Sequence, residues 1–297
     1  MNPRVPNAIH RPPTQSKDHH QAMIGEPPPS QYDWRFNFLG FPIRVTWLFW
    51  LITAALGYSI AMSANQLFSR IGQSPGIAPL LAIWVACVMV SVLVHELGHA
   101  LAFRYYGIES QIVLYHMGGL AIPTAGFSFN RSGARYRLQH IDHIVISLAG
   151  PLLQFVSAIL VAAVAYAMGV FVPSAADFVE WIKPRGVENP WTQGDLSIGN
   201  PWTYAMLNFY ILVSIWWPLL NLLPVYPLDG GHVVQHTAAI LRRTDGYNEA
   251  YLIGAGVGFL VAWWFFQSGS PINALLFLSL AMNNVQAMQR FGGPPGW

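Results

Sequence analysis

The feature that most constrains this chain is an uncharged stretch of eighteen residues, Ile77 to Val94, in which Ser91 is the single hydroxyl side chain. An apolar run of this length predicts a membrane-spanning helix. The run leads directly into His95, Glu96 and His99. Ionisable side chains are costly to place at the end of such a helix, so they are candidates for a functional site.

The spacing of these three residues indicates what kind of site they could form. His95 and His99 are four residues apart, so on a helix their imidazoles lie on one face and can bind the same ion. His-Glu-x-x-His is the motif of zinc metalloproteases, in which the glutamate, here Glu96, is the general base. The alternative is a pair of interfacial histidines with a solvated glutamate, and the motif alone leaves that open.

Composition places the chain in a membrane. It is 54% hydrophobic and 9% charged, whereas a soluble domain carries about 25% charged residues. Its single cysteine, Cys87, excludes an intrachain disulfide and a zinc cage of thiolates. The net charge of +2 and the absence of a basic run give no indication of nucleic-acid binding.

The fold class predicted is an all-α polytopic membrane protein with six transmembrane helices and a re-entrant β-hairpin after the second. We expect residues 1–40 to be a disordered cytoplasmic tail, residues 41–290 to be the transmembrane domain and residues 291–297 to be a C-terminal tail. The predicted spans are 41–62, 77–103, 144–172, 201–223, 247–266 and 271–288.

Two connections between the spans have a marked character. Residues 111–123 are too short to span as a helix, and their two β-prone runs around Gly118-Gly119 predict the hairpin. Non-helical backbone beside a membrane persists where protein buries it or where it lines a cavity, so we place the hairpin next to the metal. The polar loop 173–200 is long, and its role is not readable from the sequence.

Charge predicts the orientation of the spans. With six spans, twelve of the fifteen lysines and arginines fall on the side of the two termini. The positive-inside bias therefore predicts cytoplasmic termini in a multi-pass protein, which we expect in a prokaryotic cell membrane. The His95 end of its span then lies towards the cytoplasm.

A catalytic zinc takes three protein ligands and keeps one position for water. Asp229 is the best remaining candidate for the third ligand, because it follows the end of a span at Pro224 and Pro227 that reaches the same side as His95. An aspartate before Gly-Gly is also typical of an ordinary turn or a helix N-cap. His116 and His232 are more simply explained as packed or supporting histidines, and neither belongs to the predicted zinc set.

The chain resembles the site-2 protease family of intramembrane zinc metalloproteases. The resemblance covers residues 41–290. It is carried by His95-Glu-Leu-Gly-His99, by Asn221-Leu-Leu-Pro-Val-Tyr-Pro-Leu-Asp229-Gly-Gly, by Gly118-Gly119 and by Ala149-Gly150-Pro151. The chain departs from the family where members often have asparagine three residues after Gly-Pro. It has Gln154 there, and we assign that position no role.

The resemblance implies a role for each residue. His95, His99 and Asp229 would bind one zinc ion per chain, and Glu96 would activate the water. Asn221 would hold the substrate or the oxyanion. Gly118 and Gly119 would lie in a hairpin that pairs with an unwound substrate as an added strand.

The function expected is hydrolysis of a peptide bond within or next to a transmembrane segment of a membrane-embedded protein in the lipid bilayer, as in regulated intramembrane proteolysis. The alternatives are a metal-binding membrane transporter and a catalytically inactive scaffold. A prenyl-protein endopeptidase would instead need a distal glutamate ligand, for which Glu249 is the candidate. The sequence does not indicate the substrate or the oligomeric state.

Overall fold

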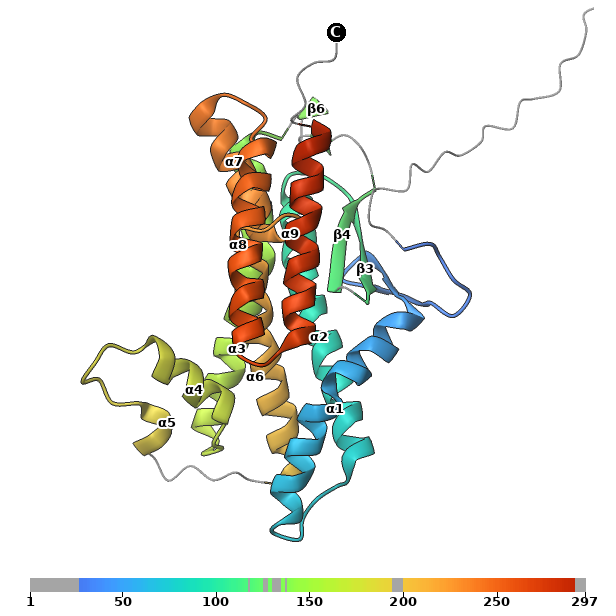
Figure 1. The fold of residues 1–297 in the computed structure, drawn as a ribbon. Coiled ribbons are helices and arrows are strands. Elements are labelled where there is room, and N and C mark those ends of the chain that lie inside the picture. The colour runs from blue at the N-terminus through green and yellow to red at the C-terminus, as the bar shows by residue number, and fades with distance from the viewer. Residues whose placement is uncertain are drawn as a thin grey trace, which may run out of the picture.

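The structure is a computed structural model that describes residues 27–116, 118–124, 128–129, 135–136, 138–193 and 200–291. A bundle of long helices makes up most of it, with a small sheet on one side (Figure 1). The long helices are α1 (Trp47–Ser69), α2 (Ile77–Tyr105), α3 (His140–Ala167), α6 (Pro201–Asn221), α8 (Tyr247–Gln267) and α9 (Pro271–Phe291). The shorter helices are α4 (Pro173–Ile182), α5 (Pro190–Gln193) and α7 (Asp229–Arg242).

Five of the described helices are long and apolar enough to cross a membrane: α1, α2, α3, α6 and α8. The prediction of a multi-pass membrane protein is confirmed to that extent. The predicted sixth span forms α9, which is as long as α8 but carries Asn283, Asn284 and Gln286 in its second half. Length and composition therefore do not mark α9 as a span.

The first span was predicted six residues too early, and the predicted tail boundary at residue 40 falls inside a β-hairpin. Strand β1 (Trp34–Phe38) pairs antiparallel with β2 (Phe41–Val45), and α1 begins after them. In β2 the side chains of Phe41, Ile43 and Val45 are buried, while those of the alternate residues Pro42 and Arg44 are not. Burial of every second residue is the pattern of a strand with one buried face. A prediction based on apolar runs alone overlooks this alternation.

The predicted hairpin belongs to a larger sheet, so the molecule is not all-α. Strands β3 (Ser110–Tyr115) and β4 (Gly118–Pro123) pair antiparallel, and β3 pairs in parallel with β2. The sheet order is β1-β2-β3-β4, which leaves β4 at one edge. A second pair, β5 (Ser128–Phe129) and β6 (Arg135–Tyr136), is antiparallel.

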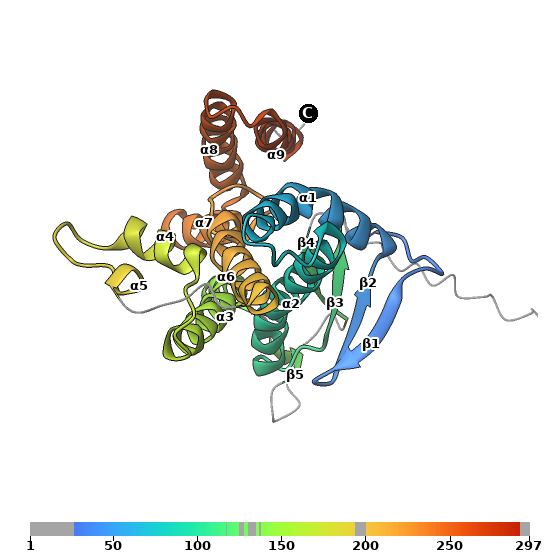
Figure 2. The same ribbon diagram turned by 90° about the horizontal axis from the view of Figure 1, so that it is seen from below.

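Helix α2 lies at the centre of the bundle and packs against α1, α3 and α6. Seen from below, the pair α8 and α9 stands to one side of this group (Figure 2). A Cβ atom on Gly98 of α2 would collide with the backbone of Ala149 and Gly150 in α3, so the two helices touch backbone to backbone. Ala149-Gly150-Pro151 thus lies at this contact, as small residues commonly do where membrane helices approach closely.

Helix α6 ends at Asn221, and α7 begins at Asp229 after a short irregular segment. Pro224 and Pro227 lie in that segment, as expected for residues that cannot continue a helix. Helix α7 packs against α3 on the same side of the molecule as the start of α3 (Figure 1). The break therefore places Asp229 next to the end of α2 that carries the histidines.

Candidate metal centre and active site

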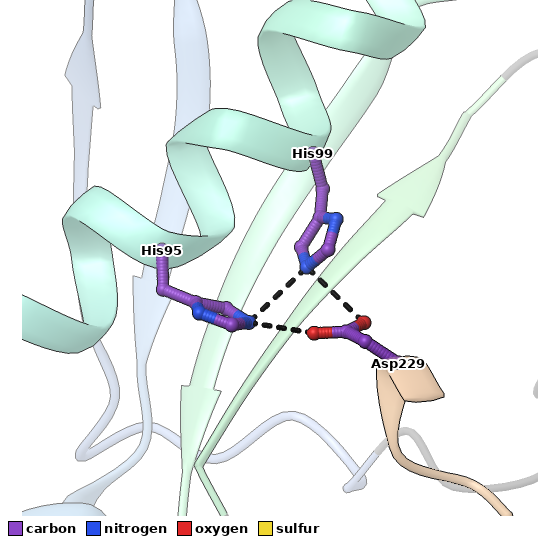
Figure 3. A group of neighbouring side chains, drawn as sticks. All are labelled: His95, His99 and Asp229. Atoms are coloured by element: carbon purple, nitrogen blue, oxygen red, sulfur yellow. Dashed lines mark hydrogen bonds and ion pairs between the residues drawn. The ribbon is translucent and has the colours of Figure 1, made fainter. Parts of the chain in front are cut away.

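Three side chains from two distant parts of the sequence meet at one point (Figure 3). His95 Nε2 lies 3.0 Å from Asp229 Oδ2 and 3.2 Å from His99 Nε2. His99 Nε2 lies 3.3 Å from Asp229 Oδ1. Among the residues that the structure describes, these three form the one group of three or more His, Cys, Asp and Glu side chains able to share a metal ion. The predicted ligand set is thus brought together.

The hydrogen bonds behind the two imidazoles test whether this group fits a cation. His99 Nδ1 donates to the carbonyl oxygen of Ile146 over 2.8 Å, and His95 Nδ1 donates to Gln154 Oε1 over the same distance. In the neutral form that binds a metal, a ring that donates through Nδ1 keeps an unprotonated Nε2. Two nitrogen lone pairs and a carboxylate then face one another, an arrangement that a cation stabilises. Tetrahedral Zn²⁺ at about 2.0–2.1 Å from each nitrogen separates two such atoms by about 3.3 Å, so the donor set fits zinc.

Gln154 is the residue that sequence reasoning missed. Its side chain is fully buried in α3, and its Nε2 donates to Ser91 Oγ over 2.7 Å while its Oε1 accepts from His95. Ser91 Oγ in turn shares a 2.7 Å hydrogen bond with Ser214 Oγ of α6. The orientation of His95 is therefore held by a buried polar chain that crosses three helices, the kind of support that metal-bound histidines usually have.

Glu96 is buried beside the group, with 4% of its surface exposed. The backbone N–H of Ala121 in β4 donates to its carboxylate. A Cβ atom on Gly119 would collide with the Glu96 side chain, so glycine at this position lets the strand lie directly against the glutamate. Strand β4 thus borders Glu96 and fixes its carboxylate.

Charge at the site favours an ionised Asp229. Burial raises the pKa of this carboxyl, but His99 and His95 outweigh burial and hold the pKa below its usual range. One turn further along α7, burial lowers the pKa of His232, whose ring packs against Tyr226 at 4.6 Å. His232 is therefore a neutral ring beside the group, and it is not one of the three residues that meet there.

The other predicted residues lie as follows. Gly118 has a φ of 129°, which favours glycine, and a side chain there would meet Trp217 of α6. The Asn221 amide donates to the carbonyl oxygen of Trp217 on its own helix, 3.0 Å away. His116 stands in contact with the ring of Tyr115. The alternative ligand Glu249 forms an ion pair with Arg242 at 3.2 Å.

Comparison with known proteins identifies the family of the chain. Residues 83–265 match the family model of peptidase family M50. A zinc metalloprotease of Methanocaldococcus jannaschii is 26% identical over 251 residues, which are 84% of this chain and 54% of that protein. A protein of Synechocystis sp. is 25% identical over 237 residues, 79% of this chain and 51% of its own length. The chain thus spans about half the length of these relatives.

A solved structure, the site-2 protease from Methanocaldococcus jannaschii, aligns with a TM-score of 0.43 and 25% identity, over 86% of this chain and 94% of that one. The family model covers more than half of the chain, and its matched range includes His95, Glu96, His99 and Asp229. The chain belongs to peptidase family M50.

Proposed function

We propose that this protein is an intramembrane zinc metalloprotease that hydrolyses a peptide bond within or next to a transmembrane segment of a membrane-embedded substrate. The observation that carries the proposal is the meeting of His95, His99 and Asp229 beside the buried Glu96. Membership of family M50 and the five apolar helices support it.

In this proposal the zinc ion is held by His95 Nε2, His99 Nε2 and Asp229. When bound, it supplies a Lewis acid that polarises the scissile carbonyl and makes water a better nucleophile near neutral pH. Gln154 and the Ile146 carbonyl keep both imidazoles turned towards it. The short segment between α6 and α7 brings Asp229 to the same depth as the histidines.

Glu96 is the general base. Its carboxylate accepts a proton from the attacking water and then donates it to the nitrogen of the leaving amine. The Ala121 N–H bond and the close backbone of Gly119 hold the carboxylate in one position. Asn221 is proposed to contact the substrate or the oxyanion after its amide turns away from Trp217.

The outer edge of β4 is proposed to bind the substrate. A transmembrane helix hides its peptide bonds in internal hydrogen bonds, so it must unwind before it is cut. An unwound segment can add to a sheet edge as a further strand. Because β4 is the edge strand and its Gly119 touches Glu96, pairing along Gly118 and Gly119 would bring a peptide bond to the base.

An apolar cavity beside the hairpin supports a hydrophobic substrate. It has a volume of ≈ 310 Å³ and lies between α1, α2, α6 and the hairpin. Its wall includes Trp84, Trp216, Trp217 and Gly118. A cavity with such a lining suits the apolar side chains of a membrane segment held at β4.

We propose that α9 is a sixth span and that both termini are cytoplasmic, as the distribution of lysine and arginine favours. Cysteines introduced at Gln73 and Thr244 would then react with a membrane-impermeant maleimide from opposite sides of a sealed vesicle. Labelling of both from the same side would contradict this orientation.

The decisive experiment combines zinc content with cleavage of a single-span protein, using the parent, Asp229→Ala and Glu96→Gln. The proposal expects the parent to cut, Asp229→Ala to lose the ion bound by the group, and Glu96→Gln to keep that ion without cutting. Glu249→Gln is the matched control and should behave as the parent. Full activity of Asp229→Ala, or loss of the ion in Glu249→Gln, would overturn the assignment.

The same variants separate the alternatives. A transporter would bind the ion and move it across vesicles, with Glu96→Gln leaving transport intact. A scaffold would bind the ion and cut nothing in any variant. A prenyl-protein endopeptidase would depend on Glu249.

A further inference from the structure

Three histidines outside the metal centre lie together where α3 begins against α7. His140 is the first residue of α3, His143 follows one turn later, and His236 is on α7. His140 Nδ1 lies 3.1 Å from His236 Nδ1, and the His143 ring stacks on the His236 ring with centroids 4.4 Å apart and planes at 8°. His140 is exposed, while the other two are half-buried.

The distance between the two facing nitrogens is close to that in the metal centre. There, His95 Nε2 and His99 Nε2 are 3.2 Å apart. Two nitrogens that share one tetrahedral zinc ion are about 3.3 Å apart. The pair His140 and His236 is therefore spaced as two ligands of one ion, and it comes from two different helices that already pack together.

The chemical state of His236 suits a ligand. The pKa of His236 is lowered to about 4. Burial is the largest cause, and the neighbouring rings of His143 and His140 add to it. The ring is thus neutral at pH 7, which is the form that binds zinc. The parallel His143 ring restricts its orientation, so less freedom remains to be lost on binding.

The pair is separate from the metal centre but lies along the same contact between helices α3 and α7, here called the α3–α7 seam. Asp229, His232 and His236 are spaced by three and four residues, so they lie along one face of α7. At 1.5 Å per residue, His236 lies about 10 Å along the helix from Asp229. On α3, Ile146, whose carbonyl oxygen accepts from His99, lies one turn beyond His143.

We propose that His140 and His236 bind a second divalent transition-metal ion, of the zinc class, on the solvent side of the α3–α7 seam, with His143 stacked behind His236. Water completes the coordination. With two protein ligands and no carboxylate, this site binds zinc more weakly than His95, His99 and Asp229. The inference does not rest on hydrolysis, since counting bound ions tests it whether or not the protein cuts a substrate.

The test is a zinc titration of the chelator-stripped full chain in detergent, with an indicator that competes for the metal. All proteins carry His10, His19 and His20 replaced by alanine, which removes the histidines of the N-terminal region from the count. The parent should bind two ions. Asp229→Ala should lose the tighter one, and His140→Ala and His236→Ala should each weaken the other at least tenfold.

Two controls keep the result decisive. His116→Ala, a histidine of the hairpin, should bind both ions as the parent does. His140 is exposed, so His140→Ala should elute from size exclusion as the parent does, and it tests the site even where His236→Ala unfolds. A parent that binds one ion would overturn the proposal. So would a second ion that survives in His140→Ala with unchanged affinity.

Discussion

The two histidine pairs of this molecule have nearly the same spacing but very different surroundings. His95 and His99 are buried, each ring donates through Nδ1 to a fixed oxygen, and a carboxylate lies opposite. His140 and His236 meet at the surface between two helices, through nitrogen alone. The spacing of two imidazoles makes metal binding feasible, while the hydrogen bonds behind them and the base beside them make a site suited to catalysis.

The largest expected effect separates the two sites. His99→Ala removes one of three ligands, so the ion at His95 and Asp229 should be lost and cleavage should fall to background. The ion at His140 and His236 should remain. Zinc counting and a cleavage assay on the same preparation measure both. Loss of both ions together would show that the two sites are not independent.

Loss of the base alone should be nearly as severe. Glu96→Gln keeps the size of the side chain and removes proton transfer, so cleavage should fall by about 10²- to 10⁴-fold. Both zinc ions should stay bound, as measured by metal content. A variant that still cuts at a tenth of the parental rate would remove Glu96 from its role.

Variants of Gln154 test the importance of the hydrogen bond that orients His95. Gln154→Leu removes the acceptor for His95 Nδ1 and should weaken zinc binding at the centre by about 10- to 100-fold. Gln154→Glu keeps an acceptor oxygen and should retain most of the affinity, which a merely space-filling role would not explain. Competition titration with a zinc indicator measures this. Equal affinities in Gln154→Leu and the parent would contradict the positioning role.

A smaller effect concerns the close contact of α2 with α3. A Cβ atom at Gly150 would collide with the His99 ring, so Gly150→Ala should destabilise the fold by about 1–3 kcal/mol. The matched control is Gly256→Ala on α8, where a Cβ atom meets nothing within 4 Å. Thermal unfolding in detergent compares them. A stable Gly150→Ala would mean that the helices can move apart without loss.

The smallest effect is a pH dependence at the surface pair. The pKa of His236 is lowered from 6.5 to about 4 in the folded chain, so between these values the unfolded chain binds more protons. The contribution of His236 to stability is thus present above pH 6.5 and is lost as the pH falls towards 4. In metal-free protein, His236→Gln should show a shallower fall of the unfolding temperature over this range. An unchanged slope would contradict the shift.

The grouping of His95, Glu96 and His99 could be predicted from the sequence because these residues obey short-range rules. His95, Glu96 and His99 are fixed by helical periodicity, and Pro224 and Pro227 end a helix wherever they occur. The five apolar helices are likewise visible as long runs without charge. Short-range rules do not place Asp229, because its approach to α2 depends on the packing of α7 against α3.

What the sequence could not supply are contacts between distant segments. Gln154 was set aside because it departs from the family pattern, yet a glutamine inside an apolar helix needs a buried partner, and that need is a usable signal. Strands β1 and β2 were missed because Phe41 to Val45 is mostly apolar and leads almost directly into the apolar helix α1. The parallel pairing of β2 with β3 joins segments separated by the whole of α1 and α2, which no local pattern reveals.

His95 and Asp229 lie 134 residues apart in the chain. During synthesis, the helix with both histidines enters the membrane well before the ribosome reaches Asp229. Until α7 emerges and packs against α3, the nascent chain has two of its three ligands and no complete centre. The proposed protease would therefore gain its activity only after helices α1, α2, α3 and α6 have been made.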